Sequence, residues 1–272
     1  MLDHAPSRGQ LNYVLACVEI NKKPFFYDAT SKMSTPNLIR PAAFNYFGYL
    51  MTDKEAKKLE ILPPNKSNTI LNIDAKLSKD GFFSGHFSDT DTDLYAMLNQ
   101  EEYNKGKAEY QTTNYKARYA FPLSNIKSEV INDFDFQTSF DFDSDTFVDG
   151  IGNKFVFNPL LFLYSKNHDF DQADERKSPI ELLTGYNKLK KVTITLPDGY
   201  AYENVPTSKK FRTDDNAIGY LYKVTQEGNK LIIESTVTVE DPVFPKEYYP
   251  AFKQIFDNIT KFESQVVTVV KK

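Results

Sequence analysis

The chain of 272 residues has no tryptophan, one cysteine and three histidines, and these shortages exclude several kinds of chemistry. The single Cys17 cannot form an internal disulfide or a cysteine zinc cluster. His4, His86 and His168 are scattered, so no histidine metal site or cofactor is predicted. Neither His86 nor His168 has a partner carboxylate or a Ser or Cys pattern that suggests catalysis, so we expect no catalysis from them.

Long apolar runs and a surplus of one charge are also missing. No run approaches the ~20 residues that a membrane-spanning helix needs, so no membrane span is predicted. The 33 Lys and Arg against 37 Asp and Glu give a net charge of −4, without the basic footprint of a nucleic-acid-binding protein. The N-terminus lacks the basic and apolar regions of a signal peptide.

Aromatic residues are plentiful, and 22 Phe with 17 Tyr require a buried core. Most apolar patterns have the spacing of strands, and two have the spacing of helices, so the expected fold class is mainly β (α+β). Helices are expected at 94–105 and 246–262, with Asp89–Asp93 capping the first. Strands are expected at 11–20, 24–30, 46–51, 69–77, 82–87, 125–147, 154–157, 190–196, 217–225, 230–239 and 266–270.

A polar, proline-rich segment, Pro63–Asn68, is the best linker in the chain. It predicts two domains, residues 1–62 and a β-sandwich-type domain with short helices at 63–272. A strand pattern begins almost at the first residue. Either its neighbours come from later sequence, or the chain is the C-terminal part of a longer protein.

The segments Gln10–Ile20 and Phe25–Thr30 resemble the end of a transglutaminase-like core. In that papain-related family a catalytic His begins one strand and a catalytic Asp ends the next. The His accepts a proton from a Cys nucleophile, and the Asp orients the imidazole. The resemblance places Asp28 at the family's Asp position and Tyr13 at its His position. It implies that residues 1–62 are the C-terminal hairpin remnant of such a core.

Tyr13 is a poor substitute for His, because a tyrosine with a pKa of about 10 does not shuttle protons near neutrality. The family's nucleophile precedes the His, whereas Cys17 follows that position inside an apolar strand and is expected to be a small buried hydrophobe. We therefore expect a vestigial, inert site. The alternative is part of a transglutaminase or cysteine-protease-like enzyme whose nucleophilic Cys lies upstream.

Residues 10–272 also resemble, as a whole, the C-terminal part of large exported bacterial proteins with a transglutaminase-like core between β-rich domains of unknown function. This resemblance implies a non-catalytic interaction or scaffolding module in the periplasm or outside the cell, with a protein or peptide partner. Apolar residues on both faces of the N-terminal hairpin predict self-association through it. The motifs that carry the resemblance are Ile73–Gly85, Phe157–Leu161, Arg176–Ile180, Leu196–Pro206 and the terminal helix and strand.

Three further patterns bear on function. Asp141, Asp145 and Asp149 suit a calcium loop, but the alternation of Phe and Asp around them favours a strand with one buried face. The Lys188–Lys191 cluster is expected to be solvated at the start of a strand. Four tyrosines at strand spacing form either a ligand platform or part of the core: Tyr200, Tyr202, Tyr220 and Tyr222.

Overall fold

The structure is a computed structural model, and it describes residues 13–44, 46–170 and 176–272. The chain divides into two compact units, Met1–Lys66 and Ser67–Lys272. The boundary lies within the proline-rich segment, because the first strand of the second unit already begins at Ser67. His4 and the first two residues of the predicted N-terminal strand lie outside the described residues.

The first unit contains two hairpins. Strand β1 (Ala16–Ile20) pairs with β2 (Lys23–Tyr27), and β3 (Tyr46–Met51) pairs with β4 (Ala56–Ile61). Asn21 and Lys22 join β1 to β2 with φ angles of 52° and 64°, as a tight type I′ turn requires. Strand β4 was missed in the sequence because its lysines and glutamate interrupt the apolar alternation.

Little of the first hairpin is buried. The sequence predicted a first strand covered on both faces, and for the described part this is wrong, since Val14 is 90% and Val18 49% exposed. The reason is that, among the described residues, no further layer packs on the face of the β1–β2 pair that carries Val14 and Val18. The unit's buried apolar side chains come instead from the following loop and the 3₁₀ turn Pro41–Ala43: Leu38, Ile39 and Ala43.

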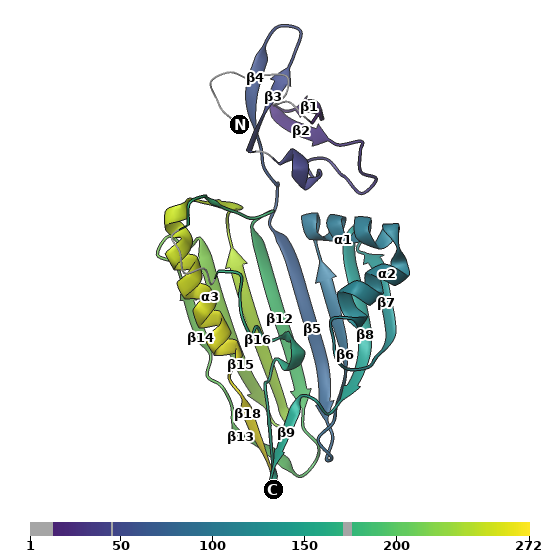
Figure 1. The fold of residues 1–272 in the computed structure, drawn as a ribbon, viewed down its shortest axis with the longest axis vertical. Coiled ribbons are helices and arrows are strands. Elements are labelled where there is room, and N and C mark those ends of the chain that lie inside the picture. The colour runs from purple at the N-terminus through teal and green to yellow at the C-terminus, as the bar shows by residue number, and fades with distance from the viewer. Residues whose placement is uncertain (1–12, 45, 171–175) are drawn as a thin grey trace. The chain divides into compact units, whose positions relative to one another are not determined.

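The second unit is built on an eight-stranded sheet (Figure 1). Its central strands β5 and β12 are parallel, and every other pair in the sheet is antiparallel. The order is β14 (Lys209–Arg212), β15 (Ile218–Glu227), β16 (Lys230–Val239), β12 (Tyr186–Thr195), β5 (Ser67–Leu77), β6 (Phe83–Asp91), β8 (Asp135–Ser144) and β7 (Leu123–Ile131).

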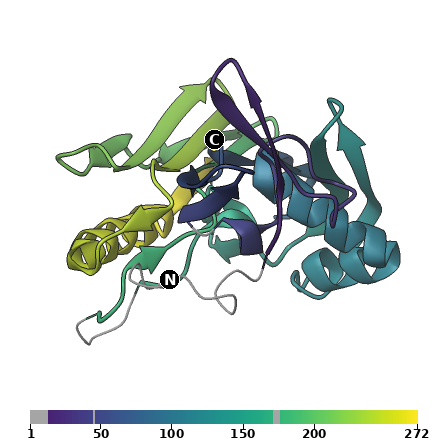
Figure 2. The ribbon, with the colours of Figure 1, turned by 90° about the horizontal axis from the view of Figure 1, so that it is seen from above.

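Helices and a second, smaller sheet cover the buried face of the large sheet. Helix α1 (Asp93–Lys105) contacts β5, β6 and β8, whereas α3 (Tyr249–Glu263) contacts β15. Figure 2 shows α3 toward one edge of the large sheet and α1 toward the other. The smaller sheet has the order β13 (Tyr200–Asn204), β18 (Val267–Lys271), β10 (Lys154–Phe157) and β9 (Val148–Ile151). Shorter elements are α2 (Lys107–Gln111), the π-turn Thr112–Lys116, the 3₁₀ turns Leu161–Leu163 and Lys246–Tyr248, and the strand pair β11 (Ile180–Glu181) and β17 (Val243–Phe244).

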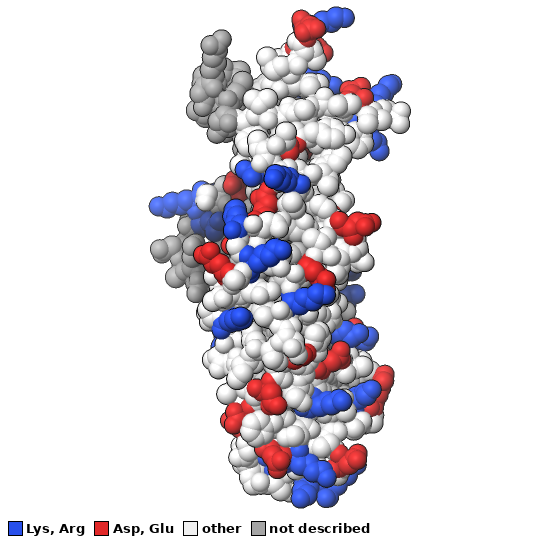
Figure 3. All heavy atoms as spheres, turned by 90° about the vertical axis from the view of Figure 1, so that its right-hand side faces the viewer, with Lys and Arg blue, Asp and Glu red and all other residues white. Residues whose placement is uncertain are grey.

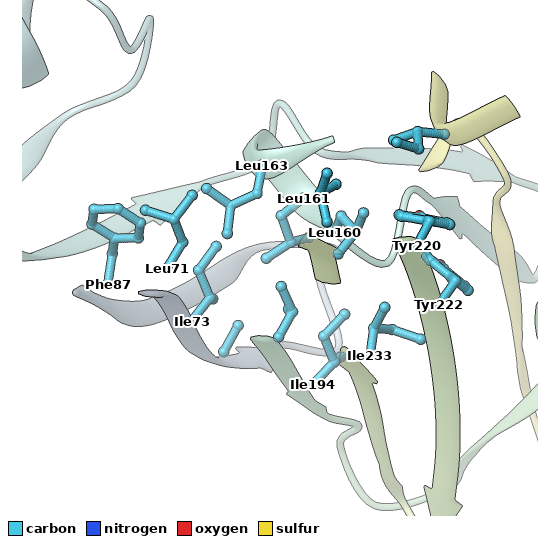
Figure 4. Close-up of a cluster of buried hydrophobic side chains, with 14 of the residues drawn as sticks. Leu71, Ile73, Phe87, Leu160, Leu161, Leu163, Ile194, Tyr220, Tyr222 and Ile233 are labelled. Carbon is cyan, nitrogen blue, oxygen red and sulfur yellow. The ribbon is translucent and has the colours of Figure 1, made fainter. Parts of the chain in front are cut away.

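The core fills the space between the large sheet and this covering layer (Figure 4). Leu71, Ile73 and Ile194 of the sheet face Leu160 and Leu161 of a connecting segment. Tyr220 and Tyr222 are 2% and 0% exposed, so these two tyrosines belong to the core. The prediction of a mainly β fold is confirmed. Within the described residues, no helix combines the length and the apolar character that crossing a bilayer demands.

The two units differ in how firmly their strands are held. Strands β1 and β2 form an isolated pair, and two-stranded sheets are marginally stable in water. Strands β12 and β16 lie inside the eight-stranded sheet with partners on both sides. We therefore expect the amides of Ala16–Ile20 and Lys23–Tyr27 to exchange with deuterium far faster than those of β12 and β16. Mass-spectrometric hydrogen exchange checks this, and equal protection in both regions would contradict it.

Candidate functional site

The first candidate site joins Tyr13, which precedes β1, to Asp28, which directly follows β2. The Tyr13 hydroxyl donates a hydrogen bond of 2.6 Å to Asp28 Oδ2 and lies 2.8 Å from Thr30 Oγ1. Asp28 Oδ1 accepts from the Thr30 hydroxyl at 2.6 Å and from the Thr30 amide at 2.9 Å. The structure thus brings together the two residues that the resemblance singled out.

The two groups have opposite pKa shifts. Burial of Asp28, which is 6% exposed, raises its pKa, but hydrogen bonds from Thr30, Tyr13 and the Arg40 amide outweigh burial, and the net pKa is lowered. Burial and the Asp28 carboxylate raise the pKa of Tyr13. At neutral pH the pair is therefore a carboxylate that accepts from a neutral phenol. This pair can orient a group, but it has no base that takes up a proton near pH 7.

Cys17 lies in β1 opposite Phe26 of β2 and is half-buried rather than fully buried as expected. Burial and the nearby Glu19 raise the pKa of its thiol. Because the thiolate is the reactive form, this environment disfavours nucleophilic chemistry.

The second candidate site is a cavity of about 1050 Å³ within the unit Ser67–Lys272. Its floor is part of the buried face of the large sheet. In adjacent strands, Asp91 lies opposite Thr69, and Thr69 opposite Lys188. The next row of the same face holds Asp89, Leu71 and Lys190. Further rings and amides enclose the space, among them Tyr95 and Asn99 of α1, Tyr119, Phe121, Phe162 and Asn158.

Asp89 and Asp91 are the acidic pair of this floor. Asp91 is 7% exposed and accepts hydrogen bonds from Thr69 and, at 2.6 Å, from Asn99. Asp89 accepts from the Tyr115 hydroxyl at 3.1 Å through Oδ2, while its buried Oδ1 has no partner among the described residues. Burial and the charge of Asp91 raise the pKa of Asp89 to about 7, and burial also raises the pKa of Asp91.

A buried ion pair borders the same cavity. Lys190 donates to Glu263 Oε2 at 2.6 Å and to Ser165 Oγ at 2.9 Å. Glu263, 0% exposed at the end of α3, also accepts from the Ser235 hydroxyl at 2.6 Å and from the Ser165 amide at 2.7 Å. Burial lowers the pKa of Lys190, and Glu263 opposes that shift. This network connects the sheet, α3 and the segment after β10.

The predicted solvation of the lysine cluster is wrong for Lys190, which is 5% exposed. Strand alternation turns Lys188 and Lys190 toward the inside of the unit, where Lys190 pairs with Glu263 and Lys188 lies near Asp89 and Asp91, and leaves Lys191 exposed. The predicted cap at Asp89–Asp93 is also wrong in part, because β6 continues to Asp91.

The expectation that His86 and His168 lack partner carboxylates is wrong as well. His86 Nδ1 lies 2.7 Å from Asp141 Oδ1, and His168 Nε2 lies 2.8 Å from Asp257 Oδ1. These partners are 55 and 89 residues away in sequence, so local inspection could not find them.

The acidic segment around Asp141 belongs to β8, as the strand interpretation predicted. Phe136, Phe140 and Phe142 are buried, and Asp141 binds His86 and Asn125 Nδ2. Among residues 13–44, 46–170 and 176–272, no group of three or more His, Cys, Asp or Glu side chains could hold a metal ion.

The cavity residues were missed in the sequence, although a signal for them exists. Phe83, Phe87, Asp89 and Asp91 all lie at odd positions of one strand, so the buried face that begins with phenylalanine continues with aspartate. Reading that alternation past Ser88 would have placed both carboxylates inside the unit. The sheet register that adds Lys188 and Lys190 could not be read, because β5 and β12 are far apart in sequence.

Comparisons with known proteins locate one domain. Residues 153–269 match the model of a family described as a domain of unknown function with a solved structure, DUF3858. No curated protein matches the chain. Among solved structures, the chain is similar to a crystal structure described as a "putative protease from Parabacteroides distasonis ATCC 8503", with 11% identity and a TM-score of 0.44. The match covers 94% of this chain and 35% of that chain, so this chain spans about a third of its length. A similarity this low carries no argument about activity.

The raised pKa of Asp89 predicts a pH-dependent stability. Because the folded pKa of about 7 exceeds the unfolded value of about 3.9, the folded chain retains a proton that the unfolded chain releases. The free energy of unfolding should fall between about pH 4 and pH 7, by up to about 1.4 kcal/mol per pH unit. Asp89→Asn should flatten this dependence and stabilise the chain most above pH 7. Urea denaturation across that range measures it.

The matched control is Asp143→Asn, which changes an exposed carboxylate on the neighbouring strand β8. It should leave the pH dependence as in the unsubstituted chain. If Asp89→Asn and Asp143→Asn have parallel pH profiles, burial of Asp89 does not control the stability.

The buried ion pair predicts a non-additive double mutant. Lys190→Met should cost about 3–5 kcal/mol of unfolding free energy, because it leaves the Glu263 carboxylate buried without its cation. Adding Glu263→Gln removes that charge, so the double variant should be more stable than Lys190→Met alone. Chemical denaturation of the single and double variants gives the coupling. A double variant less stable than Lys190→Met would contradict this electrostatic account.

Proposed function

We propose that the chain is a non-catalytic interaction and scaffolding module of an exported bacterial protein with a transglutaminase-like core. The observation that carries this proposal is the hydrogen bond of 2.6 Å from the Tyr13 hydroxyl to Asp28. A Cys-His-Asp site needs a nitrogen base beside the carboxylate, and here a phenol with a raised pKa occupies that side of Asp28. The pair keeps the hairpin arrangement of the resembled core without its proton acceptor.

Two further observations bear on this proposal. Residues 153–269 carry a DUF3858 domain, which agrees with the resemblance to exported proteins that contain β-rich domains of unknown function. We also propose a location in the periplasm or outside the cell, which rests on that resemblance. The face of the molecule in Figure 3 has Lys and Arg interspersed with Asp and Glu, so it presents no broad field of one sign.

The interaction surface that we propose is the β1–β2 hairpin. Val14, Val18, Ile20 and Tyr27 are 90%, 49%, 47% and 39% exposed. Exposed apolar side chains that cluster on one short element are typical of protein contact sites. The hairpin would serve self-association or the binding of a protein or peptide.

The alternative function is that of an enzyme part whose nucleophilic Cys lies upstream of this chain. Asp28 favours it, since a buried carboxylate with a lowered pKa is the state that an orienting residue of a triad requires. The two functions differ in whether the Tyr13–Asp28 pair affects chemistry.

We expect the purified chain to show neither hydrolysis of casein or peptides nor acyl transfer, and Asp28→Ala and Cys17→Ala to be indistinguishable from it. The physical reason is the missing proton acceptor next to Asp28. Release of peptide fragments and incorporation of an amine label are the measurements. Activity that disappears in Asp28→Ala and persists in Cys17→Ala would overturn the proposal, because it would assign chemistry to the triad position.

A further inference from the structure

We propose that the cavity in the unit Ser67–Lys272 is a binding site for a neutral oligosaccharide. This inference goes beyond the interaction role proposed above, and it uses none of the residues of the first unit. It rests on the polar floor of the cavity, the mixing of its charges, its aromatic walls and its place on the sheet.

The floor is built from polar groups where a core would use apolar ones. Farther along the same strands, the face that carries Asp89, Asp91 and Lys190 is packed with Phe87, Ile73 and Val192. The change from apolar to charged side chains falls at the same rows of β6 and β12, whereas β5 between them keeps Leu71 and becomes polar only at Thr69. Burying such groups is unfavourable unless they are hydrogen-bonded, and Asp89 Oδ1 still has no partner among the described residues. A ligand that donates hydrogen bonds would complete this floor.

Positive and negative side chains are mixed in the cavity rather than gathered on separate sides of it. The Lys188 ammonium lies close enough to both Asp89 and Asp91 to influence their ionisation, and Arg118 does the same for Asp89. Opposite charges side by side leave the floor with little net charge, although each group still acts on an atom that touches it. The site therefore selects neither a cation nor an anion. It presents acceptors and donors side by side, which suits hydroxyl groups, since each hydroxyl both donates and accepts.

Aromatic rings supply the apolar part of the site. Phe162, Tyr119 and Phe121 form a triangle of rings: Phe162 is 4.9 Å from each of the other two centroids, and those two are 5.3 Å apart. Tyr95 and Tyr164 also line the cavity. Flat ring faces bury the C–H faces of sugar rings while polar neighbours bind the hydroxyls, as in ligand sites that combine aromatic walls with a few placed polar groups. A volume of about 1050 Å³ accommodates several sugar rings rather than one.

The floor of the cavity does not suit an extended peptide. Its floor strands β5, β6 and β12 each have hydrogen-bonded neighbours on both sides. No strand edge is therefore available on the floor for a peptide backbone to pair with, which is the usual way an extended peptide binds a sheet.

The test is isothermal titration calorimetry of the whole chain with five neutral tetrasaccharides: maltotetraose, cellotetraose, xylotetraose, mannotetraose and N-acetylchitotetraose. At least one should bind. Asp91→Asn and Lys188→Met should each weaken that binding about tenfold or more, because the first replaces a carboxylate acceptor of the floor with an amide and the second removes an ammonium donor. Asp143→Asn, on the neighbouring strand but exposed, should bind as the unsubstituted chain does. Circular dichroism establishes that each variant is folded. Because the Lys188 side chain is only half-buried, Lys188→Met provides the test if Asp91→Asn does not fold.

Failure of all five sugars to bind would overturn the inference, and so would binding that neither Asp91→Asn nor Lys188→Met weakens. If a casein peptide binds tightly instead and Asp91→Asn weakens that binding, the ligand of the cavity is a peptide and the sugar inference is overturned. Cleavage of a bound tetrasaccharide, detected by chromatography, would support the site and overturn the non-catalytic function instead. An activity that depends on Asp28 would overturn the proposed function without affecting this inference, so substitutions at different residues test the two proposals.

Discussion

The parallel pairing of β5 with β12 is the constraint on which the second unit depends. Parallel neighbours cannot be joined by a tight turn, so the chain between them must leave the sheet and return. That excursion contains β6, α1, β7, β8, β9 and β10, which means that three of the eight strands of the large sheet and much of its cover are built during the crossover. The register of this one pair also sets Thr69 beside Lys188 and Leu71 beside Lys190. Because β6 continues the same rows, a carboxylate of one half of the sheet faces an ammonium of the other across β5.

The buried Lys190–Glu263 pair is a second constraint, and it acts on how α3 packs against the large sheet. An ion pair of this kind often contributes little net stability, because the desolvation of both charges offsets their attraction. Its geometry nevertheless specifies one arrangement, since Glu263 bonds to β12 through Lys190, to β16 through Ser235 and to the segment after β10 through the Ser165 amide. Only one position of the end of α3 satisfies all three at once. The wall of the cavity next to Lys190 is thus held by hydrogen bonds with fixed directions rather than by apolar packing alone.

The sequence predicted what depends on local order and missed what depends on pairing across the sheet. Period-two patterns gave β5, β12 and β16, and the turn residues Gly81 and Gly228, with φ angles of 83° and 63°, connect hairpins where expected. The pairing of β5 with β12 joins segments more than a hundred residues apart, which no local pattern encodes. Lys190 shows the consequence: alone it is a surface lysine, and only its register beside Leu71 and its contact with Glu263 make it a core residue. The proximity of Tyr13 and Asp28 could be predicted from the sequence, because a short hairpin places them together.

That hairpin also explains how a carboxylate can remain buried beside a residue that does no proton transfer. Asp28 lies among donors, and removing any one of them would leave part of a buried charge without a hydrogen bond, which typically costs about 1–3 kcal/mol. A phenol at position 13 meets this need as well as an imidazole would, since both donate to a carboxylate at short range. The structural requirement of Asp28 is therefore for a donor, whereas the catalytic requirement is for a donor that also accepts a proton at its other end. Tyr13 meets the first requirement and not the second, so the loop that carries Asp28 keeps its hydrogen bonds with a phenol at that position.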